Sequence, residues 1–343
     1  MSEKCSVIVL NYNGKQFLEE CLISLKNQSY RDYKVYVVDN ASTDGSIEFI
    51  KKNFSWVAVI EASENFGTAE GSNVGARHSE GECIVLMSND IRVDKYCIEN
   101  LVKTMEDEPK VGICSSKLIK YDKDPETDNY LIDNAGGIID KFAFPMMLRA
   151  NEVNNENEST VEEIFFSCGG AFIIRRELFN KIGGFDHKYF TLSDDIDLSW
   201  RVRLAGFEVV VNHSAFIYHK VSATLGSLFS KATKRFWSER NNLRSILKNY
   251  EFFTLIAVLP QYFCLLFMEA CFYLLIGRFA LSFTIGRAVW WNIANFSDTM
   301  KQRRNVNSFR IVSDKFILNK MYRGSIKVKM LLEMIKGFRG KMI

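Results

Sequence analysis

The first part of the chain alternates between short apolar runs and segments in which apolar residues recur at helical spacing. The apolar runs are residues 5–10, 33–39, 56–61 and 83–87, and the helical segments between them are 15–27, 43–52 and 68–79. Strands that alternate with helices and are apolar along nearly their whole length are typical of a parallel sheet. The pattern therefore predicts an α/β fold with a mainly parallel central sheet.

Polar segments follow three of the predicted strands, at residues 11–14, 39–43 and 88–90. In an open α/β sheet, ligands bind beyond the carboxyl ends of the strands. The three segments should therefore meet at one crevice, which is the expected binding site.

Three glycines of the third helical segment are spaced by four residues: Gly67, Gly71 and Gly75. This spacing places them on one face of a helix, where they permit close packing or backbone contact with a ligand. The spacing differs from the Gly-x-Gly-x-x-Gly fingerprint, and no strand leads directly into it, so an NAD-dependent enzyme is not expected.

Acidic and imidazole side chains at strand ends are candidates for ligand binding. Asp39 ends a buried strand, where a carboxylate is costly unless it is paired, and either a pyrimidine N3–H or the start of the next helix could supply the partner. Asp90, in the segment 88–90, could hold a divalent cation through its oxygens, although Asn-Asp is also ordinary turn chemistry. His219 closes the alternating run 209–218 and is either a structural residue or a ligand.

A cluster of carboxylates at 194–197 is the candidate catalytic group. A turn at 183–186 precedes it, and apolar residues recur after it at helical spacing: Ile196, Trp200 and Leu204. Asp194 and Asp195 should therefore lie at a helix N-terminus, where backbone N–H groups favour the ionised carboxylate. An ionised Asp could act as a general base, and the alternative is a helix cap with solvated neighbours. The polar segment 121–160 should form loops over this site, where contacts to an acceptor would vary.

The chain has 343 residues, a net charge of +3 and eight cysteines. The cysteines are scattered, mostly within apolar runs, and none forms a Cys-x-x-Cys pair, which favours a reducing compartment. No signal peptide precedes the first apolar run, so the N-terminal domain is expected in the cytoplasm. From position 298 onward, twelve Lys or Arg stand against three Asp or Glu. Because no nucleic-acid-binding motif accompanies this charge, an anionic membrane surface is the expected neighbour and nucleic acid is not.

The C-terminal third predicts membrane association. Residues 231–248 read as a basic amphipathic helix, and 252–276 is apolar and long enough to span a bilayer. The run 279–296 is shorter and contains Arg287, which is costly at mid-membrane. Basic flanks on both sides of the pair keep both ends cytoplasmic if the pair forms a hairpin or lies in the interface. Two helices packed on the soluble domain are the remaining alternative.

Several motifs occur together in one order, and the combination resembles the family 2 glycosyltransferases of the GT-A fold, most closely the rhamnosyltransferase-like branch. The motifs are residues 6–14, 37–45, 65–75, 88–90, 168–171, 183–186 and 194–198. The resemblance covers about residues 5 to 220.

The resemblance implies a role for individual residues. Asp39 is expected to contact the nucleobase, Asp90 to be the last acid of the DXD metal motif and His219 to be the second metal ligand. Asp195 is the expected general base, with Asp194 as the alternative because it replaces the usual Glu. Ser88 stands where the DXD motif usually begins with Asp or Asn, which weakens the expectation of a metal. The other expected contacts to the donor are Asn11, Asn13, Asn40, Ser42, Asn65, Gly67, Asn73, Ser88 and Asn89, and those to the acceptor are Gly169, Gly170 and Trp200.

The expected activity is inverting transfer of a sugar from a dTDP- or UDP-linked donor, with Mg²⁺ or Mn²⁺, to a lipid-linked or cell-surface glycan at the cytoplasmic face of the membrane. Direct transfer to polyprenyl phosphate, or an inactive nucleotide-sugar-binding assembly partner, are the alternatives. A homodimer is a further expectation. The expected organisation is a GT-A catalytic domain at 1–225, an amphipathic helix at 226–250, a hydrophobic pair at 251–297 and a basic tail at 298–343.

Overall fold

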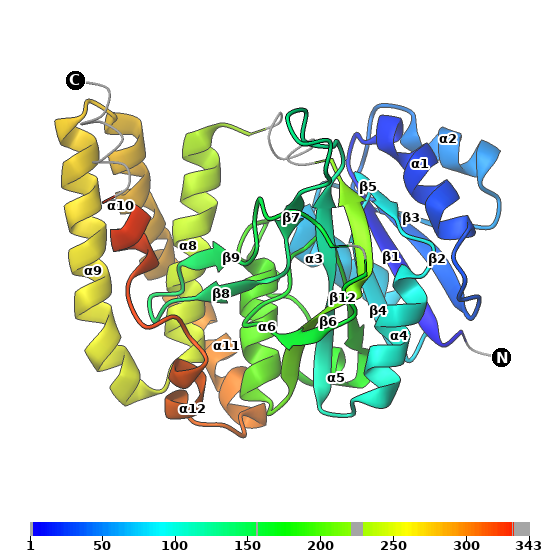
Figure 1. Cartoon of the computed structure of the whole chain (residues 1–343). Helices are drawn as coiled ribbons and strands as arrows, with labels where there is room; N and C mark the ends of the chain where they lie inside the picture. The colour runs from blue at the N-terminus through cyan, green and yellow to red at the C-terminus, as the bar shows by residue number, and fades with distance from the viewer. Residues whose placement is uncertain (1–2, 156, 221–228, 331, 333–343) are drawn as a thin grey trace. The chain divides into compact units, whose positions relative to one another are not determined.

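The computed structural model describes residues 3–330 and 332, apart from 156 and 221–228 (Figure 1). The chain divides into two compact units. Unit 1 comprises residues 1–137 and 147–229, and unit 2 comprises 138–146 and 230–343. The expected boundary at 225/226 lies outside the described residues. Unit 2 includes the expected amphipathic helix from residue 230 onward and all of the hydrophobic pair and the basic tail.

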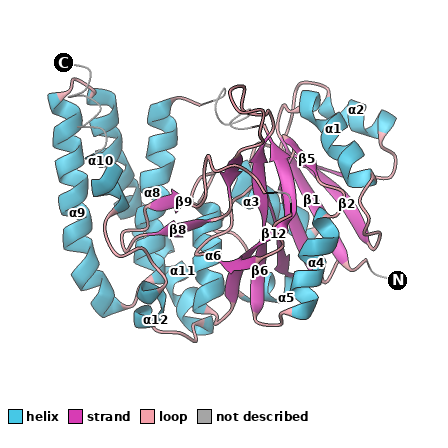
Figure 2. Ribbon diagram, in the orientation of Figure 1, coloured by secondary structure: helices cyan, strands magenta, loops and turns pink. Residues whose placement is uncertain are grey.

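Unit 1 is built on a mixed sheet of ten strands in the described part of the chain (Figure 2). Its main path runs β10-β12-β6-β11-β4-β1-β2-β3, with β5 paired to β12 and β7 paired to β6. The strands are β1 (Cys5–Asn11), β2 (Tyr33–Asp39), β3 (Ala58–Glu61), β4 (Cys83–Ser88), β5 (Ile91–Val93), β6 (Val111–Lys120), β7 (Ile132–Asn134), β10 (Val161–Glu163), β11 (Ala171–Arg175) and β12 (Glu208–His219). The parallel pairs are β1 with β2 and β4, β2 with β3, and β6 with β12.

The sheet is covered by helices whose apolar residues face it. Successive residues of β1 point to opposite faces, and Val7, Ile8 and Val9 are all fully buried, so both faces are covered. The helices of unit 1 are α1 (Lys15–Lys26), α2 (Ser46–Asn53), α3 (Gly67–Arg77), α4 (Cys97–Asp107), α5 (Arg176–Lys181) and α6 (Asp194–Leu204). This arrangement confirms the predicted α/β fold.

The glycines of α3 serve close packing between this helix and the sheet. A Cβ on Gly75 would lie 2.5 Å from Cγ2 of Ile8, and one on Gly71 would lie 3.0 Å from the Asn40 side chain. Gly67 has φ of +74°, and a Cβ there would lie 2.0 Å from the carbonyl oxygen of Phe190. The spacing of four residues therefore reflects the approach of α3 to β1 and to neighbouring loops.

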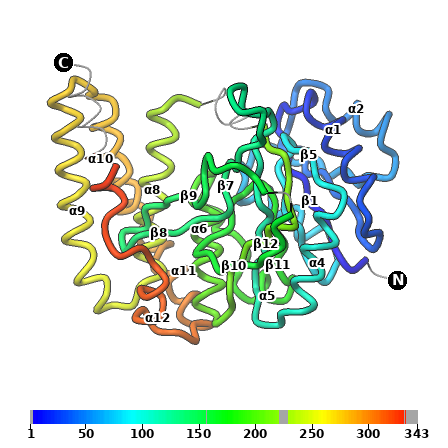
Figure 3. Tube along the Cα trace, viewed as in Figure 1, coloured from blue at the N-terminus to red at the C-terminus, as the bar shows by residue number. Residues whose placement is uncertain are grey.

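Unit 2 is a helical unit that also includes a hairpin from the middle of the chain. Its helices are α8 (Lys231–Asn249), α9 (Phe252–Leu275), α10 (Phe279–Ala294), α11 (Phe296–Phe309) and α12 (Asp314–Asn319). The strands β8 (Gly137–Ile139) and β9 (Pro145–Met147) pair to form the hairpin, which is labelled on the Cα trace in Figure 3. Helix α10 packs against α8 and α9.

The expected basic tail is folded in its first part, as α11 and α12. The Arg244 guanidinium of α8 pairs with Asp298 at 2.5 Å and donates to Thr299 Oγ1 at 2.7 Å, so α11 is held by buried polar contacts. The sequence predicted only a basic tail here, because a count of charges does not show which of them find a buried partner.

Candidate active site

The Asp39 carboxylate lies at the junction of three strand ends. It is fully buried, and it accepts hydrogen bonds from Asn11 Nδ2 and from the Ser42 backbone N–H, each at 2.7 Å. Asn11 Oδ1 in turn accepts from Asn89 Nδ2 at 2.6 Å. The ends of β1, β2 and β4 therefore meet, as the sequence predicted, and the partners that a buried carboxylate requires are present within the protein.

The loops after β1 and β2 are tied to each other next to Asp39. Asn13 has φ of +49°, its backbone N–H donates to Ser42 Oγ at 2.8 Å, and its side chain accepts from the Thr43 N–H at 2.7 Å. Gly14 allows this approach, because a Cβ there would lie 2.0 Å from Asn89 Nδ2. These contacts tie the two loops together next to Asp39.

Asn40, Asn65 and Gly67 are joined by hydrogen bonds next to these loops. Asn40 Nδ2 donates to the Gly67 carbonyl at 3.1 Å, and the Gly67 N–H donates to Asn65 Oδ1 at 2.9 Å. Asn73, expected at the donor, is buried and has both amide atoms bonded to the backbone of Phe185, at 2.9 and 3.0 Å. It holds the turn before α6 against α3.

Asp194 and Asp195 begin α6, as predicted. Asp194 Oδ2 accepts from Thr68 Oγ1 at 2.7 Å, and Asp195 Oδ1 accepts from the Ile196 N–H at 2.8 Å. Both carboxylates are half-buried. Burial and the charge of Asp194 raise the pKa of Asp195 to about 7, and burial also raises the pKa of Asp194. The sequence predicted that backbone N–H groups at the helix start would favour the ionised carboxylates. For the pKa of these groups that prediction is wrong, because burial and like-charge repulsion exceed the effect of the N–H groups.

The acceptor-side residues differ in their exposure. Gly169 is exposed, and a Cβ there would lie 3.8 Å from Asp195 Oδ2. The Gly170 carbonyl accepts from the Ser88 N–H at 3.1 Å, which joins the bend at 168–171 to the end of β4. Trp200, expected at the acceptor, has a fully buried side chain whose ring lies edge-on to Phe165. Its fully buried ring supports α6 from inside the domain.

A second group of residues gathers around His219. Its Nε2 lies 3.8 Å from Asp90 Oδ1, and its Nδ1 lies 2.9 Å from Asp133 Oδ2. Burial lowers the pKa of His219, but the hydrogen bond to Asp133 and the charge of Asp90 outweigh it, so the pKa lies above the ordinary value. Asp133 was not anticipated individually, because it lies in the polar segment 121–160 that predicted only loops.

The His219 group fits a divalent cation. Asp133 holds Nδ1, so Nε2 faces Asp90, which is the arrangement that orients metal-binding histidines. Carboxylate oxygen and imidazole nitrogen suit Mn²⁺ or Mg²⁺. Within the described residues, Ser88 Oγ is buried and has no hydrogen-bond partner, which leaves one more oxygen available at the end of β4.

The charges of two carboxylates act on the buried Cys168 thiol. Burial, followed by the charges of Asp195 and Asp133, raises the pKa of the Cys168 thiol well above its ordinary value. Both carboxylates therefore lie close enough to act on this buried thiol.

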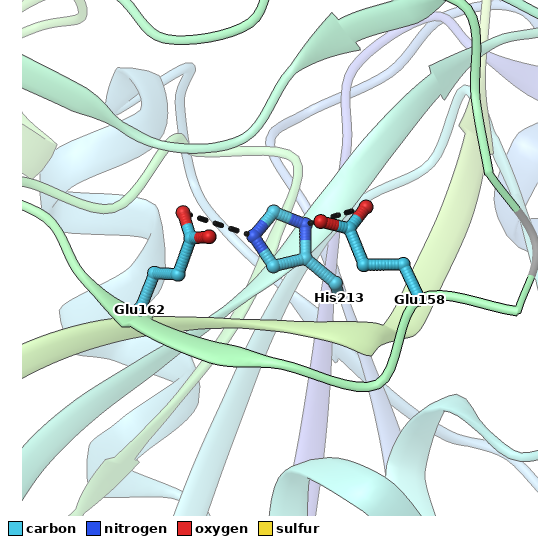
Figure 4. A group of neighbouring side chains, drawn as sticks. All are labelled: Glu158, Glu162 and His213. Carbon is cyan, nitrogen blue, oxygen red and sulfur yellow. Dashed lines mark ion pairs between the residues drawn. The ribbon is translucent and has the colours of Figure 1, made fainter.

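Another cluster of possible metal ligands consists of Glu158, just before β10, Glu162 on β10 and His213 midway along β12 (Figure 4). The imidazole lies between the carboxylates, with Nδ1 3.7 Å from Glu158 and Nε2 3.3 Å from Glu162. Arg149 Nη1 donates to Glu158 at 2.6 Å and faces His213 Nδ1 at 3.4 Å. A guanidinium in this position repels a metal ion, so the cluster is better described as an ion-pair network.

A family model described as glycosyl transferase family 2 matches residues 6–183, more than half of the chain. The chain is 24% identical over 229 residues to the glycosyltransferase GlyG of Streptococcus pneumoniae, which covers 66% of this chain and 73% of that protein. It is 22% identical over 246 residues to an N-acetylglucosaminyl-diphospho-decaprenol L-rhamnosyltransferase of Mycobacterium tuberculosis, which covers 65% and 78%.

Two solved structures show the same fold. The structure of GalNAc-T7 with UDP, GalNAc and Mn²⁺ has a TM-score of 0.57 at 16% identity, over 72% of this chain and 48% of that chain. The mannosyltransferase PcManGT from Pyrobaculum calidifontis, with GDP-Man and Mn²⁺, has a TM-score of 0.51 at 18% identity, over 90% and 86%. The family match, the fold and the site agree: this chain belongs to glycosyltransferase family 2 and has a GT-A catalytic domain.

Proposed function

We propose that this enzyme transfers a sugar from a nucleoside diphosphate to an acceptor hydroxyl with inversion at the anomeric carbon. The observation that carries the proposal is Asp195, a half-buried carboxylate with a pKa raised to about 7, beside the exposed Gly169 at the start of α6. A general base works best when its pKa lies near the working pH. A carboxylate that served only to cap the helix would not need the exposed Gly169 beside it.

In this mechanism Asp195 removes the proton of the acceptor hydroxyl as its oxygen attacks the anomeric carbon. The bond from that carbon to the nucleoside diphosphate breaks in the same step, so no covalent enzyme intermediate forms. Asp194 raises the proton affinity of Asp195 through its charge and is held in place by Thr68. The two carboxylates therefore have separate roles, one as base and one as the group that adjusts it.

We propose that a uracil or thymine base binds beside Asp39, whose fully buried carboxylate has to become accessible for this contact. Each Asp39 oxygen accepts one hydrogen bond from the protein and can accept a second, which matches a pyrimidine N3–H. The Ser42 and Asn13 contacts hold this loop in the shape that the base would enter. We therefore propose a UDP- or dTDP-linked donor.

Asp90 and His219 would hold the divalent cation, and Asp133 would orient His219. A bound Mg²⁺ or Mn²⁺ would supply neutralisation of the charge that develops on the departing diphosphate. The contact from Asp133 fixes the imidazole, and Asp90 lies two residues after the end of β4.

We further propose a lipid-linked acceptor and membrane association at the cytoplasmic face. One described helix, α9, is long and apolar enough to cross a membrane, and large side chains on it are exposed: Phe253, Phe263, Phe267 and Leu275. The M. tuberculosis relative named above is a transferase whose name specifies a diphospho-decaprenol substrate. Both observations support an acceptor that is carried in a membrane.

The buried face of α9 favours an interfacial position over a span. Glu269 of α9 forms ion pairs with Arg235 of α8 and, at 2.5 Å, with Lys327. If α9 crossed the bilayer, both basic partners would have to lie at membrane depth, which is costly. An in-plane helix keeps these ion pairs within the protein and presents only the opposite apolar face to lipid.

The test is turnover with a panel of UDP- and dTDP-linked sugars, Mn²⁺ and a polyprenyl-diphosphate saccharide, with NMR analysis of the new linkage. The expected product has the inverted anomeric configuration. A retained configuration contradicts the single displacement. Transfer to polyprenyl phosphate itself would establish the synthase alternative, and nucleotide-sugar binding without any transfer would establish a binding protein.

A further inference from the structure

Unit 2 contains a pocket of about 700 Å³ that has no part in the site described above. The hairpin contributes Lys141 and Phe142, helix α9 contributes Cys264 and Leu265, and the segment after α12 contributes Arg323. This volume lies in the range of small-molecule binding sites.

The pocket combines apolar walls with two cations. Lys141 Nζ donates to Gln261 Oε1 at 2.8 Å, and the Arg323 side chain is exposed. Neither has a carboxylate within ion-pair distance among the described residues. The neighbouring Asp140 does not supply one, because its buried oxygens accept the backbone N–H groups of Phe142, Phe144 and Ile326.

Other Lys and Arg side chains of the same unit, which are less exposed, have carboxylate partners. Arg235 and Lys327 share Glu239 and Glu269, and Arg310 pairs with Asp314 at 3.0 Å. Unlike these three side chains, Lys141 and Arg323 have no carboxylate partner in the part of the chain that the structure describes. Such a pocket is complementary to an anion with two charges that is attached to an apolar chain.

We infer that this pocket binds the diphosphate head group of a long-chain isoprenoid lipid, with the first part of the chain against Leu265 and Phe142. A diphosphate diester carries two negative charges, which match Lys141 and Arg323, whereas the phosphodiester of a common anionic phospholipid carries one. Met268 and Leu275 lie on the same face of α9 as the pocket-lining Cys264 and Leu265 and are exposed, and the rest of the chain would lie along them. The inference rests on the proposed function, because it names the lipid that carries the acceptor.

The test uses the full-length protein in detergent and three probes: geranylgeranyl diphosphate, geranylgeraniol and inorganic diphosphate. Geranylgeranyl diphosphate should bind best, because it alone has both features. The double variant Lys141→Gln/Arg323→Gln should weaken its binding by about tenfold or more, because two charge-assisted contacts are lost. The control Lys301→Gln/Arg304→Gln removes the same charge from the exposed surface of α11 and should bind like wild type.

A second readout does not depend on variants. Cys264 is an exposed thiol that lines the pocket, whereas Cys271 is half-buried on the same helix and does not line it. Geranylgeranyl diphosphate should slow maleimide labelling of Cys264 and leave Cys271 unchanged. Equal labelling of Cys264 with and without the probe would overturn the inference.

Other outcomes also test the inference. Equal affinity for geranylgeraniol, an unaffected double variant, or equal competition by phosphatidylglycerol micelles would each overturn a site for an isoprenoid diphosphate. Binding of UDP or dTDP, measured on the same samples, separates this inference from the proposed function. Nucleotide binding without pocket-dependent lipid binding refutes the inference alone, whereas lipid binding in a protein that binds no nucleotide refutes the proposed function alone.

Discussion

At the scale of single residues, the active site depends on how burial changes Asp195. The sequence places two carboxylates at a helix start, where an ionised form is favoured, but α6 is packed so that burial and Asp194 raise the pKa of Asp195 to about 7. A sequence pattern can locate the carboxylates. It cannot give their protonation, which depends on packing around Thr68 and Gly169.

The pH profile should report this carboxylate. If Asp195 acts as a base, kcat/KM should fall by about tenfold per pH unit below about 7, because only the ionised form accepts a proton. Asp194→Asn should move this acidic limb to lower pH, since the charge that raises the pKa of Asp195 is removed while Thr68 can still donate to the amide oxygen. An unmoved limb in Asp194→Asn would contradict the electrostatic role of Asp194.

Stability should depend on pH through the same group. The folded-state pKa of Asp195 is raised, so the folded state binds more protons than the unfolded state between the ordinary value of 3.8 and about 7. Stability from this group is therefore present at low pH and lost as pH rises through this window. Asp195→Asn should raise Tm relative to wild type more at pH 8 than at pH 4. A Tm difference that is the same at both pH values would show that burial of Asp195 has little effect.

Asp133 should matter through His219. Asp133→Asn should raise the Mn²⁺ concentration needed for half-activity by about 10- to 100-fold, because His219 loses the carboxylate that orients it. Asp90→Ala and His219→Ala should have at least as large an effect. Glu162→Gln, from the ion-pair network around His213, is the control and should leave the metal requirement unchanged. Full wild-type activity in excess chelator would exclude a metal from the reaction.

At the scale of elements, apolar periodicity predicted the first half of the sheet well. Strands β1, β2 and β4 begin at the predicted residues, Cys5, Tyr33 and Cys83. Helix α2 begins at Ser46 and not at 43, because the Asp44 side chain accepts the Ser46 N–H and Gly45 has φ of +79°, which together form a turn first. Local hydrogen bonds of this kind compete with the helix and do not change the apolar pattern.

The packing of α3 on β1 gives a stability prediction. Gly75→Ala should destabilise the protein by about 1–3 kcal/mol, because the new Cβ would overlap Ile8. Gly286→Ala in α10 is the control, since a Cβ there meets open space and Ala favours a helix. Urea unfolding of both variants checks this. Equal midpoints would mean that α3 shifts away from β1 at little cost.

At the scale of the whole molecule, the chain's organisation could be predicted only in part. The sequence order suggested a catalytic domain followed by separate C-terminal segments. Residues 138–146 instead belong to unit 2, where Phe144 stacks on Tyr262 and the Tyr250 hydroxyl donates to the Lys141 carbonyl at 2.8 Å. Such contacts join residues more than a hundred positions apart, and no local pattern reports them.

This organisation changes how membrane attachment should be tested. Deleting residues 251–343 should give a more soluble protein, because the exposed apolar face of α9 is removed, but it would also strip the 138–146 hairpin of its partners. Replacing Phe253 and Phe267 with Ser should weaken vesicle binding and leave the hairpin contacts in place.

A second test uses a variant in which Cys264 and Cys271 are replaced by Ser and Ser325 by a reporter cysteine. This reporter should be labelled only from the cytoplasmic side of sealed vesicles. Release of the wild type by high salt alone would contradict apolar attachment.

The central claim is that Asp195 is the base of a sugar transfer, and one comparison tests it most directly. Turnover of a UDP- or dTDP-linked sugar by wild type and Asp195→Asn should be measured beside the affinity of each for the nucleotide. We expect kcat of Asp195→Asn to be lower by about two to four orders of magnitude while nucleotide affinity stays nearly unchanged. Turnover by Asp195→Asn at the wild-type rate would contradict the central claim.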